Sequence, residues 1–195
     1  RRTGEVGAGH VQSQLAISSA RQLASKIDDD TLKALPLTAG FRMVPYYALT
    51  RFGRWDEMLS EPEPPAFSAV LRAVWHYARG LSLVARDRIP AAEQELRQLI
   101  ALTADPSMKE AMFSPNLSSA IIAPAPAVLA GEIAAARGDY DLAISQLDRA
   151  VRLEDSLVYT EPSEFHFPPR LALGAILLRA GRAAEAETVY WEDLR

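Results

Sequence analysis

The stretch AVLAGEIAAARGDYDLAISQL, residues 127–147, has the pattern of two short helices joined by a tight turn. Its apolar residues recur at steps of three and four on both sides of Gly138, as one buried face of a helix requires. Gly138 tolerates the left-handed backbone that commonly ends a helix, and Asp139 can accept hydrogen bonds from the first amides of the next one. The stretch therefore predicts a helical hairpin.

The same pattern occurs in two further stretches, HYARGLSLVARDRIPAAEQEL (76–96) and RLALGAILLRAGRAAEAETVY (170–190). Each copy has a glycine seven residues before its turn residue and an alanine five residues after it. The glycines are Gly80, Gly131 and Gly174, the turn residues Asp87, Gly138 and Gly181, and the alanines Ala92, Ala143 and Ala186. Because glycine costs about 1 kcal/mol relative to alanine inside a helix, its recurrence predicts that the two helices of each hairpin pack closely there.

This arrangement resembles the tetratricopeptide repeat (TPR) family, whose unit of about 34 residues forms a pair of antiparallel helices. The resemblance is strongest in 124–157 and weakest in 39–61, where Tyr46 occupies the usual small position. RFGRWDEML, WHYARG and YTEPSEFHFP are similar to phrases of bacterial TPR proteins of unassigned function. The resemblance implies an all-α fold: a right-handed α-solenoid of antiparallel helix pairs with two loop insertions.

The expected organisation is one solenoid domain over residues 11–195, a fragment of a longer chain, preceded by a tag remnant or cut edge at 1–10. Its expected parts are a leading helix (11–38), repeats at about 39–61, 73–104, 124–157 and 167–195, and insertions at 105–123 and 158–166. Long connections in a solenoid commonly lie on one face, which is often the binding face. Both insertions are rich in proline and apolar residues, so we expect them to pack rather than to act as solvated linkers.

Composition excludes several classes of function. The net charge of −4 among 195 residues gives no electrostatic reason to bind nucleic acid or an anionic membrane. The chain has no cysteine, and no apolar run approaches the roughly 18–20 residues that span a bilayer. Phosphate-loop, dinucleotide and zinc motifs are absent from the sequence, so no cofactor or metal is expected. These features favour a cytoplasmic, non-enzymatic protein, although a targeting signal could lie upstream.

Within the TPR resemblance, fixed positions of each first helix face a concave groove. The candidate partner-binding residues there are Tyr77, Leu81, Val84, Val128, Glu132, Leu171 and Leu178. The family's carboxylate clamp needs lysine and asparagine at two of these positions, which this chain lacks. Such an apolar groove must be covered by the chain's own insertions, by a partner's helix or peptide, or by a neighbouring subunit.

Three functions remain open on this sequence. The first is a protein–protein interaction scaffold that uses the groove and the 154–170 loop, where Glu164 and His166 are further candidate partner-binding residues. A homo-oligomer through the groove or the truncated end is also left open. The second is a sensor or regulatory domain that binds a small molecule or peptide between repeats and insertions. The least favoured is an enzyme centred on His166 and Glu164, since imidazole titrates near neutrality; it would require His76 to approach His166. A buried histidine with one hydrogen bond is the expected role of His76.

Overall fold

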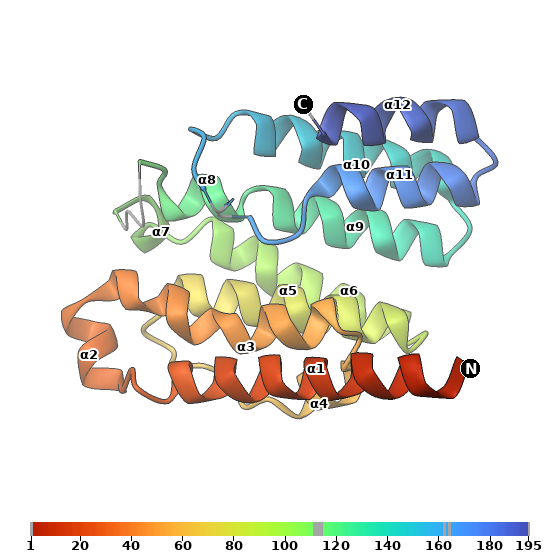
Figure 1. Ribbon diagram of the computed structural model, residues 1–195. Helices are drawn as coiled ribbons and strands as arrows, with labels where there is room; N and C mark the ends of the chain where they lie inside the picture. The colour runs from red at the N-terminus through yellow and green to blue at the C-terminus, as the bar shows by residue number, and fades with distance from the viewer. Residues whose placement is uncertain (1, 111–114, 162, 164, 195) are drawn as a thin grey trace.

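A computed structural model describes residues 2–110, 115–161, 163 and 165–194, with side chains from residue 11 on except those of residues 109 and 110. Over this part of the chain the regular structure is helical, so the expected all-α class is confirmed (Figure 1). The elements are α1 (Arg2–Ala24), α2 (Asp29–Ala34), the 3-10 helix η1 (Pro36–Thr38), α3 (Ala39–Arg51), α4 (Trp55–Ser60), α5 (Ala69–Ala85), α6 (Ile89–Thr103), α7 (Ser107–Glu110), α8 (Ser118–Ile122), α9 (Pro124–Ala136), α10 (Tyr140–Asp155), α11 (Pro169–Arg179) and α12 (Ala183–Asp193).

Consecutive helices pack as pairs, and the pairs follow one another in chain order (Figure 1). The pairs are α3 with α4, α5 with α6, α9 with α10, and α11 with α12. Helix α5 also contacts α3 before it and α9 after it, while α10 contacts α11. The fully buried side chains Leu71, Leu129 and Leu147 come from α5, α9 and α10, so one continuous core runs between successive pairs.

The four turns inside the pairs share one geometry, as the aligned turn residues predict. The turn residues are Gly53, Asp87, Gly138 and Gly181, with φ of 65°, 55°, 80° and 76°. The residue after each turn donates its N–H to the carbonyl five residues earlier: Arg54 to Leu49 (2.8 Å), Arg88 to Leu83 (2.8 Å), Asp139 to Ala134 (3.0 Å) and Arg182 to Leu177 (2.9 Å). This bond, together with the left-handed turn residue, is the Schellman ending of a helix.

The three helical glycines lie at close helix contacts, but not all at the same kind of contact. A Cβ at Gly131 would lie 2.8 Å from Leu147 Cγ and 3.2 Å from the Ala143 carbonyl oxygen, so α9 and α10 approach closely as expected. A Cβ at Gly174 would overlap the Tyr190 ring of α12. Gly80 was expected to allow close contact with α6, the other helix of its own pair, and this prediction is wrong. A Cβ at Gly80 would overlap Leu129 of α9, so the glycine allows close contact between two successive pairs.

The N-terminal segment differs from the expected single helix over 11–38. Helix α1 begins at Arg2, inside residues 1–10, and ends at Ala24; α2 and η1 follow separately. The break has a local cause, because the Asp28 carboxylate accepts a hydrogen bond from Thr31 N (2.7 Å) and so begins a new helix at Asp29. Helix α1 packs on α3, as expected of a helix leading the first repeat.

One stretch corrects the expectation that no run is apolar enough to cross a membrane. Among the described residues, the 19-residue stretch Ser118–Ala136 meets the length and composition criteria, with a mean hydropathy of 1.6 over an 18-residue window. It covers α8 and α9, which are separated at Ala123, and 61% of that window is buried inside the fold. Its apolar character is therefore accounted for by its place in the core.

Candidate functional site

Five of the expected groove residues line one pocket of about 160 Å³. They are Tyr77 and Leu81 of α5, Val128 and Glu132 of α9, and Leu171 of α11. These three helices are the first members of successive pairs, so side chains distant in sequence are brought to one place. Arg51 at the end of α3 and Phe167 also line the pocket.

The other candidate residues lie elsewhere. Val84 is half-buried and packs against the core. Leu178 lines a separate hollow of about 290 Å³ with Tyr190 and Trp191, at the end of the last helix pair. His166 stacks on Tyr47 of α3, with ring centroids 4.4 Å apart. Glu164 lies outside the described residues, so its pairing with His166 stays a prediction.

Residues 165–168, here called the crossing segment, cover one side of the pocket. Phe165 is 5% exposed, and its ring centroid lies 6.0 Å from that of Tyr77. Phe167 packs against both Tyr77 (6.1 Å) and Tyr47 (5.9 Å). Part of the groove is therefore covered by the chain's own second insertion, which was one of the three expected possibilities.

Contacts before and after the crossing segment hold it in place. Asn116, from the first expected insertion, exchanges two 2.9 Å hydrogen bonds with the backbone of Val158, from the second. Arg170 at the start of α11 makes two 2.7 Å hydrogen bonds to Asp155 at the end of α10. The two insertions thus support each other, a contact that the sequence pattern could not indicate.

Polar atoms in and beside the pocket lack partners among the described residues. The Tyr77 hydroxyl is buried without a hydrogen bond, and no hydrogen bond or ion pair joins the Glu132 carboxylate to another described residue. Burial raises the pKa of Glu132, against the opposing effect of Arg179 at longer range. The pKa of Tyr77 is raised by burial and then by the nearby charges of Glu132 and Glu154. For both groups, the negatively charged form is unfavourable in the absence of a hydrogen-bond donor or a cation.

Glu154 of α10 gives a prediction about pH. Burial raises its pKa from 4.5 to about 7, the charge of Arg170 opposes the shift, and Asp155 and Asp193 add to it. A carboxyl group with a raised folded-state pKa favours folding below pH 4.5, and that contribution is lost as the pH rises through 7. Because the group is only partly buried, solvent screening reduces the expected loss to about 1 kcal/mol.

We therefore expect Glu154→Gln to be about 1 kcal/mol more stable than the parent protein above pH 7 and to have a flatter stability profile between pH 4.5 and 7. Urea unfolding at a series of pH values measures this. Glu187→Gln, at an exposed carboxylate of α12, is the matched control and should leave the profile unchanged. Parallel profiles for parent and Glu154→Gln would contradict the burial of Glu154.

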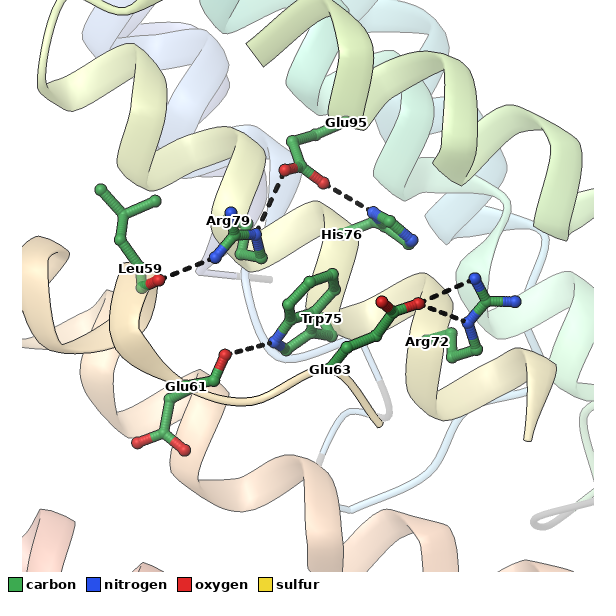
Figure 2. A network of polar contacts seen from close by, with 8 residues as sticks. All are labelled: Leu59, Glu61, Glu63, Arg72, Trp75, His76, Arg79 and Glu95. Carbon is green, nitrogen blue, oxygen red and sulfur yellow. Dashed lines mark hydrogen bonds and ion pairs between the residues drawn. The ribbon is translucent and has the colours of Figure 1, made fainter. Parts of the chain in front are cut away.

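A second polar network lies on another side of α5 (Figure 2). Glu95 of α6 accepts hydrogen bonds from His76 Nδ1 (2.6 Å) and Arg79 Nε (3.1 Å). Arg79 also donates to the Leu59 carbonyl (2.8 Å) and stacks over the Trp75 ring (4.5 Å). Burial alone would raise the pKa of Glu95, but the two donors together lower it. The network joins α4, α5 and α6.

His76 therefore has the expected role of a buried histidine with one hydrogen bond. Its partner Glu95 was not predicted from the sequence. His76 lies eleven positions before the turn residue Asp87 and Glu95 lies eight positions after it, so only the packing of α5 on α6 shows that the two side chains meet. His76 is held by Glu95 and His166 by Tyr47, and within the described residues no contact joins the two imidazoles. In that same part of the chain, no three histidine or carboxylate side chains gather where they could hold a metal ion.

No protein-family model, curated protein or solved structure matches this chain.

Proposed function

We propose that the chain is a TPR-like right-handed α-solenoid that acts as a non-enzymatic interaction scaffold and binds a segment of a partner protein at the pocket beside the crossing segment. The observation that carries this proposal is the convergence of Tyr77, Val128 and Leu171 from three successive pairs. Side chains chosen by repeat position alone would be scattered if the helix pairs did not stack in register. The recurrent Schellman turns support the same register.

The size of the pocket favours a partner side chain over a free small molecule. Sites for drug-sized ligands have volumes of about 300–1,000 Å³. The pocket has about 160 Å³ and is bounded by the crossing segment on one side. A partner could place one anchoring side chain there while the rest of its segment lies along exposed surface such as that of Leu171.

A second candidate function is the sensor, and one observation favours it. An apolar hollow of about 360 Å³ lies between α2, the start of α5 and α7, lined by Leu32, Phe67 and Met108 among others. It is large enough for a small molecule. Its cationic group, Lys33, already lies over the Phe67 ring (5.0 Å) and near Asp30 (3.8 Å), so few polar groups remain free to orient a ligand. The scaffold remains the better supported function.

Site-specific photo-crosslinking tests the scaffold. A benzophenone amino acid in place of Leu171 should form a covalent adduct with a partner polypeptide in the cells that normally make the protein. Leu142 of α10 is the matched control, because it is 47% exposed against 40% for Leu171 but lies outside the pocket. Adducts should be at least tenfold more abundant from position 171, since crosslinking requires close contact.

Mass spectrometry of the adducts separates the possible occupants. A different polypeptide joined at position 171 supports the scaffold. Equal yields from positions 171 and 142, or links only within the chain itself, contradict it. Links to a second copy of the chain would identify the homo-oligomer instead and would also contradict binding of a separate partner.

A further inference from the structure

The hollow between α2, α5 and α7 lies at the N-terminal end of a long helix. Its lining includes Ser68, the residue before α5, and Ala69 and Val70, the first two residues of that 17-residue helix. The N–H of Arg72 is the first to bond back along the helix, to the Ser68 carbonyl at 3.1 Å. The N–H groups of residues 69–71 therefore have no acceptor among the described residues. Together with the helix dipole, they make this end of α5 attractive to an anion.

The Ser68 side chain is a second free polar group in the hollow. Ser68 is only 8% exposed, and within the described chain its hydroxyl makes no hydrogen bond, not even to the first amides of α5, which a serine at this position commonly caps. Unlike the Tyr77 hydroxyl, it retains accessible surface. A buried serine that lines the hollow with an unused donor can thus bond to a molecule that enters it.

Lys33 of α2 gives the hollow a positive charge and is the charged member of its described lining. Its ammonium lies 5.0 Å from the centre of the Phe67 ring, which also lines the hollow. The contact with Asp30 is 3.8 Å long and that carboxylate is 96% exposed, so water screens the pair strongly. The ammonium can therefore exchange Asp30 for an anion inside the hollow with little loss.

The other walls suit an apolar body of limited size. They are formed by side chains from α2, α5, α7 and the connections beside them: Leu32, Pro36, Phe67, Val70 and Met108. The volume of about 360 Å³ lies within the range of small-molecule sites. A single cation beside one helix end matches one carboxylate better than a phosphate ester, which carries nearly two negative charges at neutral pH.

We propose that this hollow binds a small organic acid with one carboxylate and an apolar body, of the medium-chain fatty acid class. The carboxylate accepts hydrogen bonds from the first amides of α5 and from the Ser68 hydroxyl, and it pairs with Lys33. The apolar body lies against Leu32 and Met108. The hollow shares no described lining residue with the pocket beside the crossing segment, so this site is additional to the proposed scaffold and is tested independently of it.

Octanoate is the probe for the full chain, followed by NMR titration of the backbone amides of α2 and of the first turn of α5. Its neutral counterpart is 1-octanol, which keeps the alkyl chain and lacks the carboxylate. We expect saturable shifts at residues 69–71 with octanoate and at least tenfold weaker binding of octanol, the loss typical of a charged hydrogen bond. High salt should weaken octanoate and leave octanol nearly unchanged.

Lys33→Gln and Ser68→Ala should each weaken octanoate about fivefold and leave octanol unchanged, because each removes one polar contact to the carboxylate. Lys26→Gln, at an exposed lysine outside the hollow, is the matched control and should change neither probe. Both variants are expected to fold, since Lys33 is half exposed and Ser68 does not cap α5, and their melting temperatures serve as the check. Unaltered octanoate affinity in either variant would overturn the proposal.

Other outcomes also decide against it. Equal binding of octanoate and octanol, or no saturable binding of octanoate, would leave the hollow without a carboxylate site. Tighter binding of octyl phosphate would assign a phosphate head group, and tighter binding of Nα-acetyl-leucine would assign the C-terminus of a polypeptide. Shifts centred on Tyr77 and Leu171 would place octanoate in the pocket beside the crossing segment. Each of these results would replace the proposed acid or its site.

Discussion

Gly131→Leu should lower the free energy of unfolding by roughly 1–3 kcal/mol or more, because the new side chain has no room between α9 and α10. Its Cβ alone would lie 2.8 Å from Leu147 Cγ and 3.2 Å from the backbone oxygen of Ala143. A leucine side chain can rotate away, but a helix backbone oxygen moves only if the two helices separate. Urea unfolding followed by circular dichroism measures the loss.

Ala136→Leu is the matched control, since it adds the same side chain to an exposed position of the same helix. Its effect should stay within about 0.5 kcal/mol. A double variant, Gly131→Ala with Leu147→Val, addresses the cause: it should be more stable than Gly131→Ala alone if the Leu147 contact is part of the strain. A stable Gly131→Leu protein with unchanged unfolding would contradict the close approach of α9 and α10.

The sequence predicts the helix pairs well because their signals are local. The left-handed turn at Asp87 and the cap at Asp139 depend on residues within a few positions of each. The bounds of α9 and α10 consequently lie within the expected 124–157. The five pocket residues Tyr77, Leu81, Val128, Glu132 and Leu171 follow from the same periodicity combined with the family resemblance.

Contacts between distant segments could not be predicted in this way. The hydrogen bonds of Asn116 with Val158 join two insertions that have no repeat pattern. The contact of Gly80 with Leu129 depends on how successive pairs stack, which the spacing within one hairpin does not specify. The break in the leading segment at Asp28 is, by contrast, a local signal, because the Asp28 carboxylate caps the first turn of α2.

The crossing segment changes what the groove can bind. A bare apolar groove would accept a whole amphipathic helix along its length. Here Phe165 and Phe167 occupy part of that surface and leave a pocket of about 160 Å³. Recognition of one inserted side chain therefore fits the geometry better than recognition of a continuous apolar face.

Phe165→Ala should destabilise the protein by about 3 kcal/mol, because the ring is 5% exposed and its removal leaves a cavity against Tyr77. The loss should be concentrated at the connection, so the amide of Val158, which donates to Asn116, should also exchange faster with solvent. Hydrogen exchange and urea unfolding measure the two effects. Phe41→Ala, at a phenylalanine that is 45% exposed on α3, is the control and should change stability by only about 0.5 kcal/mol.

The two readouts together test whether the crossing segment is a structural part of the pocket. If Phe165→Ala loses stability and the Val158 amide exchanges faster, the segment is packed in place and the pocket keeps the wall that limits it to one side chain. If both values match those of Phe41→Ala, Phe165 contributes no packing. The surface around Tyr77 would then be open along its length, and a partner helix rather than a single inserted side chain would be the occupant that the groove favours.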